Sequence, residues 1–248
     1  MRTRGPALLA IAVTAMLAGC TTTSGTPVRN AAVAASAKPS PSRIPAKDEL
    51  LAALRKTHKS TYTFTVRSDG PDKERIEAKG SVDPRKKFAV SIKKRGGKFP
   101  ASLRRIVLGN DIYDHDPIAG GWAHLDMKRL KKNDYLRVDM ANPTGLATFT
   151  SAVISVNRDG PHTYRGMLDA TPTGADEFLP VGAPSLVIFG GSATFTATTN
   201  AEGWVTSIEV ELKAKETLKM TTTFGAHGKP VKITKPSNVG EAYDFYYD

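Results

Sequence analysis

Apolar and polar residues alternate along most of the chain after residue 60. In the stretch STYTFTV (60–66), Tyr62, Phe64 and Val66 alternate with threonines. A period of two residues is typical of a β-strand with one buried and one solvated face. The same alternation recurs in further stretches, which are 74–82, 86–94, 103–116, 120–126, 162–171, 190–200, 203–213, 216–228 and 230–236. The pattern therefore predicts a series of antiparallel strands, each with one apolar face.

One helix is predicted before the first strand. Leu50, Leu51 and Leu54 recur at a spacing of three to four residues up to about His58, and Asp48 is expected to cap the N-terminus of this helix.

The alternation also stops in the middle of the chain. There KRLKK (128–132) is expected to be helical, and Leu146, Phe149, Val153 and Val156 fall on one helical stripe.

The order of elements predicts an α+β fold. A helix precedes about five strands, one or two helices follow, and four or five strands complete the chain. Because every strand has one apolar face, we expect a single curved antiparallel sheet, a half β-barrel, with the helices packed on its concave face.

The N-terminus has the composition of an export signal. Arg2 and Arg4 precede an apolar run of about 11 residues, which is too short to span a bilayer. The run ends in Leu17-Ala18-Gly19-Cys20, which resembles the bacterial lipobox, and Cys20 is the only cysteine of the chain. The resemblance implies that residues 1–19 are removed and that Cys20 is acylated, which anchors the protein in the cell membrane on its extracytoplasmic side.

Composition then divides the remaining chain into a tether and a domain. Residues 20–46 are rich in Ser, Thr, Ala and Pro and contain no aromatic or acidic residue, so a flexible tether is expected. Residues 47–248 form the expected folded domain. The formal net charge is +11, and part of it lies in the tether, where anionic lipid would attract it. An exported, anchored chain without a nucleic-acid-binding motif is not expected to have a nucleic-acid partner.

Several stretches resemble actinobacterial lipoproteins of the LppX/LprG type. LGNDIYDHDPIAGGWAHLD (108–126), VISVNRDGPHTYRGMLDAT (153–171), GWVTSIEVEL (203–212) and TTTFGAHGKPVKITKPSNV (221–239) are similar to stretches of that family. The resemblance implies a helix-capped half-barrel, as in the periplasmic lipoprotein carrier LolA, with a hydrophobic cavity that holds acyl chains such as palmitate.

The predicted function is that of a lipid-anchored carrier, in which a lipid or other acyl-chain ligand lies between the sheet and the helices. The residues expected to line the cavity belong to the apolar faces of the strands and the middle helix; they are Phe64, Val66, Ile76, Phe88, Val90, Phe149, Val153, Phe195, Ile208, Val210 and Met220. A sealed core made of the same residues is the competing interpretation. In that case the protein would be a sensor or interaction module that docks an unknown partner protein.

Catalytic motifs give no support for an enzyme. The sequence has no GxSxG motif, P-loop or dinucleotide fingerprint. Asp114-His115-Asp116 is the one local cluster of metal-binding residue types, but neighbouring residues of a strand point to opposite faces. We therefore expect no catalytic residues, no metal site and no cofactor.

Overall fold

The computed structural model describes residues 44–70, 73–97, 100–116, 120–132, 134, 136–169, 192–213 and 217–247. The chain divides into two compact units, residues 1–42 and 43–248, and the described residues belong to the second. Cys20, the expected signal peptide and nearly all of the expected tether therefore lie outside the described residues.

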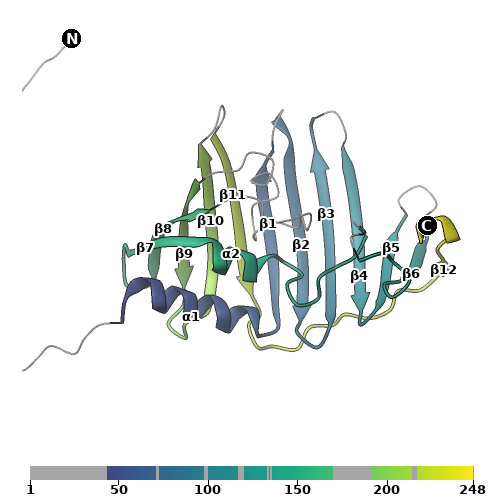
Figure 1. Ribbon diagram of the computed structural model, residues 1–248, viewed down its shortest axis with the longest axis horizontal. Coiled ribbons are helices and arrows are strands. Elements are labelled where there is room, and N and C mark those ends of the chain that lie inside the picture. Colours follow the sequence, from purple (N-terminus) through teal and green to yellow (C-terminus); the bar gives the residue numbers. More distant parts are fainter. Residues whose placement is uncertain are drawn as a thin grey trace, which may run out of the picture. The chain divides into compact units, whose positions relative to one another are not determined.

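Twelve strands form one sheet in the order β12-β6-β5-β4-β3-β2-β1-β11-β10-β9-β8-β7 (Figure 1). Their bounds are β1 (Tyr62–Asp69), β2 (Arg75–Asp83), β3 (Lys87–Arg95), β4 (Ala101–Leu108), β5 (Asp111–His115), β6 (Trp122–Asp126), β7 (Val153–Arg158), β8 (Thr163–Asp169), β9 (Ser192–Thr199), β10 (Val205–Lys213), β11 (Thr217–Gly225) and β12 (Val239–Glu241). The sheet does not close, because β7 and β12 are its two edges. The predicted α+β half-barrel is confirmed.

The chain builds this sheet in two runs that meet in its middle. Strands β1 to β6 extend in sequence order toward one edge, and β7 to β11 start at the other edge and return to pair with β1. Consecutive strands of each run pair antiparallel, and short connections favour this pairing between β1 and β2 and between β7 and β8. At the edge the prediction of a purely antiparallel sheet is wrong, because β12 pairs parallel to β6.

Helices α1 (Ala46–His58) and α2 (Leu146–Ala152) cover one face of the sheet (Figure 1), which we call the inner face. A 3-10 helix, η2 (Asp244–Tyr246), follows β12. Leu50 and Leu54 of α1 and Leu146 and Phe149 of α2 are fully buried. Among the described residues no helix has the length and apolar character needed to cross a bilayer.

Two helix predictions in the middle of the chain need correction. The segment KRLKK (128–132) forms turns rather than a helix, with Leu130 buried between exposed basic residues. The stripe predicted through Val153 and Val156 is helical only up to Ala152, because β-branched residues then continue as β7, which pairs with β8.

Two further predictions fail at the ends of the domain. Residues 230–236, expected to be a strand, have no strand structure. Prolines stand at both ends of this segment, and proline cannot donate to a strand ladder. Helix α1 begins after Pro45, so Asp48 lies in its first turn and does not cap it. There Asp48 still favours the helix through the macrodipole.

Candidate functional site

The predicted ligand-contacting residues gather on the inner face. Ten of the eleven belong to one buried hydrophobic cluster, and these are Phe64, Val66, Phe88, Val90, Phe149, Val153, Phe195, Ile208, Val210 and Met220. Ile76 is half-buried. The placement on one face follows the alternation in the sequence, while contact with a ligand stays a prediction.

Much of this cluster is closely packed around the helices. Phe149 of α2 meets Phe195 of β9 edge to face, with ring centroids 5.3 Å apart. Phe64 and Phe88 lie with parallel rings 6.3 Å apart on neighbouring parts of the sheet. These geometries are those that aromatic side chains prefer in protein interiors. The helices contact chiefly β7, β8 and β10, so this half of the inner face is well covered.

The other half of the inner face has a partly exposed apolar row. The row consists of Ile76 on β2, Ile92 on β3 and Leu103 on β4, all half-buried. Ile92 pairs with Leu103 on one side and with Ala78 on the other, and Ile76 lies two residues from Ala78 on the same face of β2. The row therefore runs diagonally across three adjacent strands. Here the inner face presents apolar surface that the helices leave incompletely covered.

The described residues between β6 and α2 (127–132, 134 and 136–145), which we call the cover segment, cross the inner face (Figure 1). Leu130 and Leu136 of this segment are buried in the core. Nη1 of Arg137 donates to the carbonyls of Met127 and Leu130 at 2.6 and 2.9 Å, and Nη1 of Arg105 on β4 donates to the carbonyl of Leu136 at 3.2 Å. Apolar burial and arginine hydrogen bonds, rather than a strand ladder, thus hold the segment on the sheet.

An ion pair lies between the apolar row and the cover segment. Arg105 on β4 binds Asp114 on β5 through two hydrogen bonds of 2.6 Å. The side chains are 11% and 20% exposed, so the pair is mostly desolvated. Asp114 therefore faces inward, whereas its neighbour His115 meets Trp122 edge to face at 5.2 Å on the opposite, outer face. Asp114 and His115 thus point to opposite faces, as expected for neighbouring residues of a strand.

Two buried hydroxyl groups also lie on the inner face. The Tyr62 hydroxyl lies 2.7 Å from Oγ1 of Thr144 in the cover segment, and burial raises the pKa of Tyr62 to about 12. Oγ1 of Thr222 on β11 is fully buried and has no hydrogen-bond partner among the described residues. An unpaired buried hydroxyl is uncommon and costs free energy.

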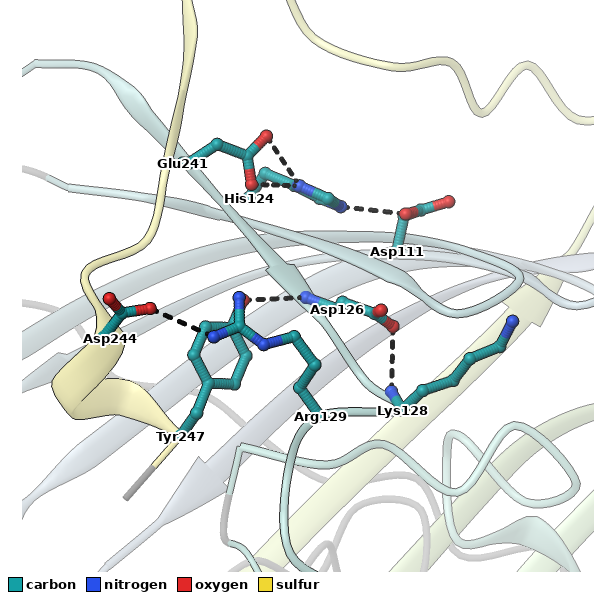
Figure 2. Close-up of polar contacts among 8 residues, drawn as sticks. All are labelled: Asp111, His124, Asp126, Lys128, Arg129, Glu241, Asp244 and Tyr247. Carbon is teal, nitrogen blue, oxygen red and sulfur yellow. Dashed lines mark hydrogen bonds and ion pairs between the residues drawn. The ribbon is translucent and has the colours of Figure 1, made fainter.

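A polar network lies at the C-terminal edge of the sheet (Figure 2). Nδ1 of His124 lies 2.8 Å from Oε2 of Glu241 on β12, and Nε2 lies 2.8 Å from Oδ1 of Asp111 on β5. Burial lowers the pKa of His124, but the hydrogen bonds to Glu241 and Asp111 outweigh it and raise the pKa above the ordinary 6.5. Because both ring nitrogens bind carboxylates, His124 ties β12 to the sheet and is poorly placed to act as a general base.

The basic residues next to this network hold the C-terminal segment (Figure 2). The Arg129 guanidinium lies 3.7 Å from the ring centroid of Tyr247 and 3.0 Å from Oδ1 of Asp244. The backbone N–H of Asp126 donates to the Tyr247 hydroxyl at 3.1 Å, and the N–H of Lys128 donates to the Asp126 carboxylate at 2.9 Å. Arg129, one of the basic residues of KRLKK (128–132), thus has a structural role.

The spacing of residues along the sequence gives no signal for the two polar clusters. Arg105 and Asp114 are nine residues apart, and His124 and Glu241 are 117 apart. Only the strand register brings the members of each cluster together. The single available signal is the position of Arg105 on the apolar face of an alternating strand, where a charge requires a partner.

Comparisons with known proteins find likenesses in structure only. No protein-family profile and no curated protein sequence matches the chain. The chain is similar to the crystal structure of LprF from Mycobacterium bovis, with 13% identity, a TM-score of 0.48, and coverage of 77% of this chain and 96% of that one. It is also similar to the LolA superfamily protein NE2245 from Nitrosomonas europaea, with 10% identity, a TM-score of 0.32, and coverage of 78% and 99%.

Proposed function

We propose that this protein is an acylated lipoprotein, anchored through Cys20, that binds a lipid or other long apolar molecule on the inner face of its sheet. The observation that carries the proposal is the apolar row of Ile76, Ile92 and Leu103, which extends the buried core toward solvent. Burial of acyl surface against such a row is favourable by about 25 cal/mol per Å².

Access to the inner face would require the cover segment to move. The segment is joined to α2 at Gly145, whose φ of 72° is a left-handed conformation that favours glycine. Displacing Leu130 and Leu136 would uncover apolar surface, and an acyl chain would replace their contacts. The polar end of such a ligand would bind the Thr222 hydroxyl, which has no partner among the described residues. An oxygen of a carboxyl or ester group can accept a hydrogen bond from this hydroxyl.

Transfer in this proposal consists of binding and release without covalent chemistry. It requires no nucleophile or general base, and the ligand leaves when an acceptor membrane offers its chains an equivalent apolar environment. Affinity should then fall by about 0.8 kcal/mol for each CH₂ removed from a fully buried chain.

The test uses the full chain carrying Cys20→Ala. Mass spectrometry of the purified protein should detect co-purified lipid, and a series of fluorescent fatty acids should bind more tightly as the chain lengthens. Affinity that does not change with chain length would contradict the proposal, as would time-dependent cleavage of an ester ligand.

A matched pair of variants tests whether the ligand binds on the inner face. Ile92→Trp fills the half-buried apolar row and should lower fatty-acid affinity, whereas Lys93→Trp adds the same side chain to the exposed outer face of β3 and should not. Equal effects of the two substitutions would show that the ligand does not bind at the row.

The close packing of the ten buried residues supports a second candidate, an interaction module with a filled core. In that case no lipid co-purifies, and the partner protein docks on the outside of the domain. Absence of both bound lipid and fatty-acid affinity, in a protein that unfolds cooperatively, would favour this second function.

A further inference from the structure

The outer face of the sheet carries an open hollow of about 430 Å³ that the proposed lipid site does not use. Its floor is formed by two rows of outward-facing side chains that the strand register aligns across β1 to β4. One row is Thr63, Ser81, Ala89 and Ile106, and the other is Thr65, Lys79, Ser91 and Arg104. The small side chains of Ser81, Ala89 and Ser91 leave the space of the hollow, and the longer side chains of Lys79 and Arg104 stand beside it.

The border of the hollow is cationic and aromatic. Lys79 and Arg104 are exposed, and neither forms an ion pair with any of the described residues. They lie on β2 and β4, two strand spacings or about 10 Å apart, so their side chains can reach one group placed over Ser91 between them. The Arg104 guanidinium lies 5.1 Å from the ring centroid of Trp122, which adds an aromatic wall from β6.

The chemistry of these side chains selects a class of ligand. Two cations without carboxylate partners suit a phosphate group, which arginine and lysine bind through charge-assisted hydrogen bonds. The hydroxyls of Thr65, Ser81 and Ser91 suit the hydroxyl groups of a polyol, and the lining includes no acidic residue that would repel an anion. The volume lies in the range of small-molecule sites.

We propose that this hollow binds a phosphorylated polyol, either a soluble sugar phosphate or the glycerophosphate headgroup of an anionic lipid. Its position on the face opposite the helices makes it a second site, independent of the acyl chains proposed for the inner face. A protein tethered near a membrane would then bind phosphorylated polyol groups on the outer face and apolar chains on the inner face.

Binding can be followed through the fluorescence of Trp122. The full chain with Cys20→Ala and Trp204→Phe keeps Trp122 as its only tryptophan, since the sequence contains two. Glucose 6-phosphate should change the emission of Trp122 saturably. Glucose lacks the phosphate group and inorganic phosphate lacks the polyol hydroxyls, so each should bind at least about tenfold more weakly. Vesicles of phosphatidylglycerol test whether the ligand is a lipid headgroup. Binding to the vesicles identifies the headgroup as a ligand of the hollow, and binding to glucose 6-phosphate identifies a soluble sugar phosphate.

Variants separate this site from general electrostatics. Arg104→Gln and Lys79→Gln should each weaken binding by roughly tenfold or more. Lys93→Gln, which removes an exposed outer-face cation outside the hollow, should change it little. Failure of glucose 6-phosphate and vesicles to bind, equal losses in all three variants, or equal affinity for inorganic phosphate would each overturn the proposal. Fatty-acid affinity should be unchanged in Arg104→Gln, so this site and the inner-face site can fail separately.

Discussion

Replacing Phe149 by alanine is expected to destabilise the domain by about 3–5 kcal/mol. Phe149 is fully buried between α2 and the sheet and contacts Phe195 edge to face. A phenylalanine buries about 150–250 Å², which at about 25 cal/mol per Å² corresponds to about 4–6 kcal/mol for the whole side chain. Alanine retains the Cβ, and the cavity left behind relaxes only in part, which gives the expected range.

The loss should also release α2 from the sheet. This helix has seven residues, and Asn142 Oδ1 accepts a hydrogen bond from the N–H of Ala147 in its first turn. It is still too short to be stable by itself and depends on the burial of Leu146 and Phe149. Hydrogen exchange in α2 should therefore rise in Phe149→Ala more than in α1. Ser151→Ala, on the exposed side of the same helix, is the matched control and should change stability by no more than about 0.5 kcal/mol.

Urea unfolding of the full chain with Cys20→Ala, followed by circular dichroism, measures the change. A double-mutant cycle with Phe195→Ala should give a coupling energy of about 0.5–1.5 kcal/mol for the two rings. A loss below about 1 kcal/mol in Phe149→Ala would refute the reasoning, because a fully buried aromatic ring in a packed core cannot be removed so cheaply.

Three further predictions concern the anchor and the polar clusters. Cys20→Ala should move the protein from the membrane to the soluble exported fraction or leave it unprocessed; a membrane-bound variant of normal mature mass would disprove the anchor. The pKa of His124 is raised in the folded protein, so its stabilising bond to Glu241 is complete below pH 6.5 and is lost as the pH rises through the folded-state pKa. Hydrogen exchange in β12 should therefore accelerate with rising pH by more than the intrinsic exchange rate does. The same acceleration in His124→Gln would contradict this explanation. Arg105→Met should cost about 2–4 kcal/mol in urea unfolding because it leaves the carboxylate of Asp114 unpaired, and adding Asp114→Leu should restore most of it; no recovery would show that the ion pair is not the cause.

Local regularities explain why the fold class was predictable. The alternation around Phe64, Val90 and Val210 requires a strand with one buried face whatever its neighbours are, and one-sided strands need helices or another layer to cover them. The same alternation placed on one face the nine proposed ligand residues that come from predicted strands. Predictions failed where apolar spacing fits two structures. Val153 and Val156 continue a helical stripe but also suit a strand, and pairing with β8 decided between them.

What the sequence by itself determined is the set of side chains on each face of each strand. That property depends only on the period of two residues in an extended chain. Which strands become neighbours was decided by the tertiary structure, because register is fixed by turns and by long-range pairing. The meeting of β1 with β11, the bond from His124 to Glu241, the inward ion pair of Arg105 and the outer hollow all depend on that register. The free energy that selects it is distributed over the whole sheet, so no short stretch of sequence encodes it.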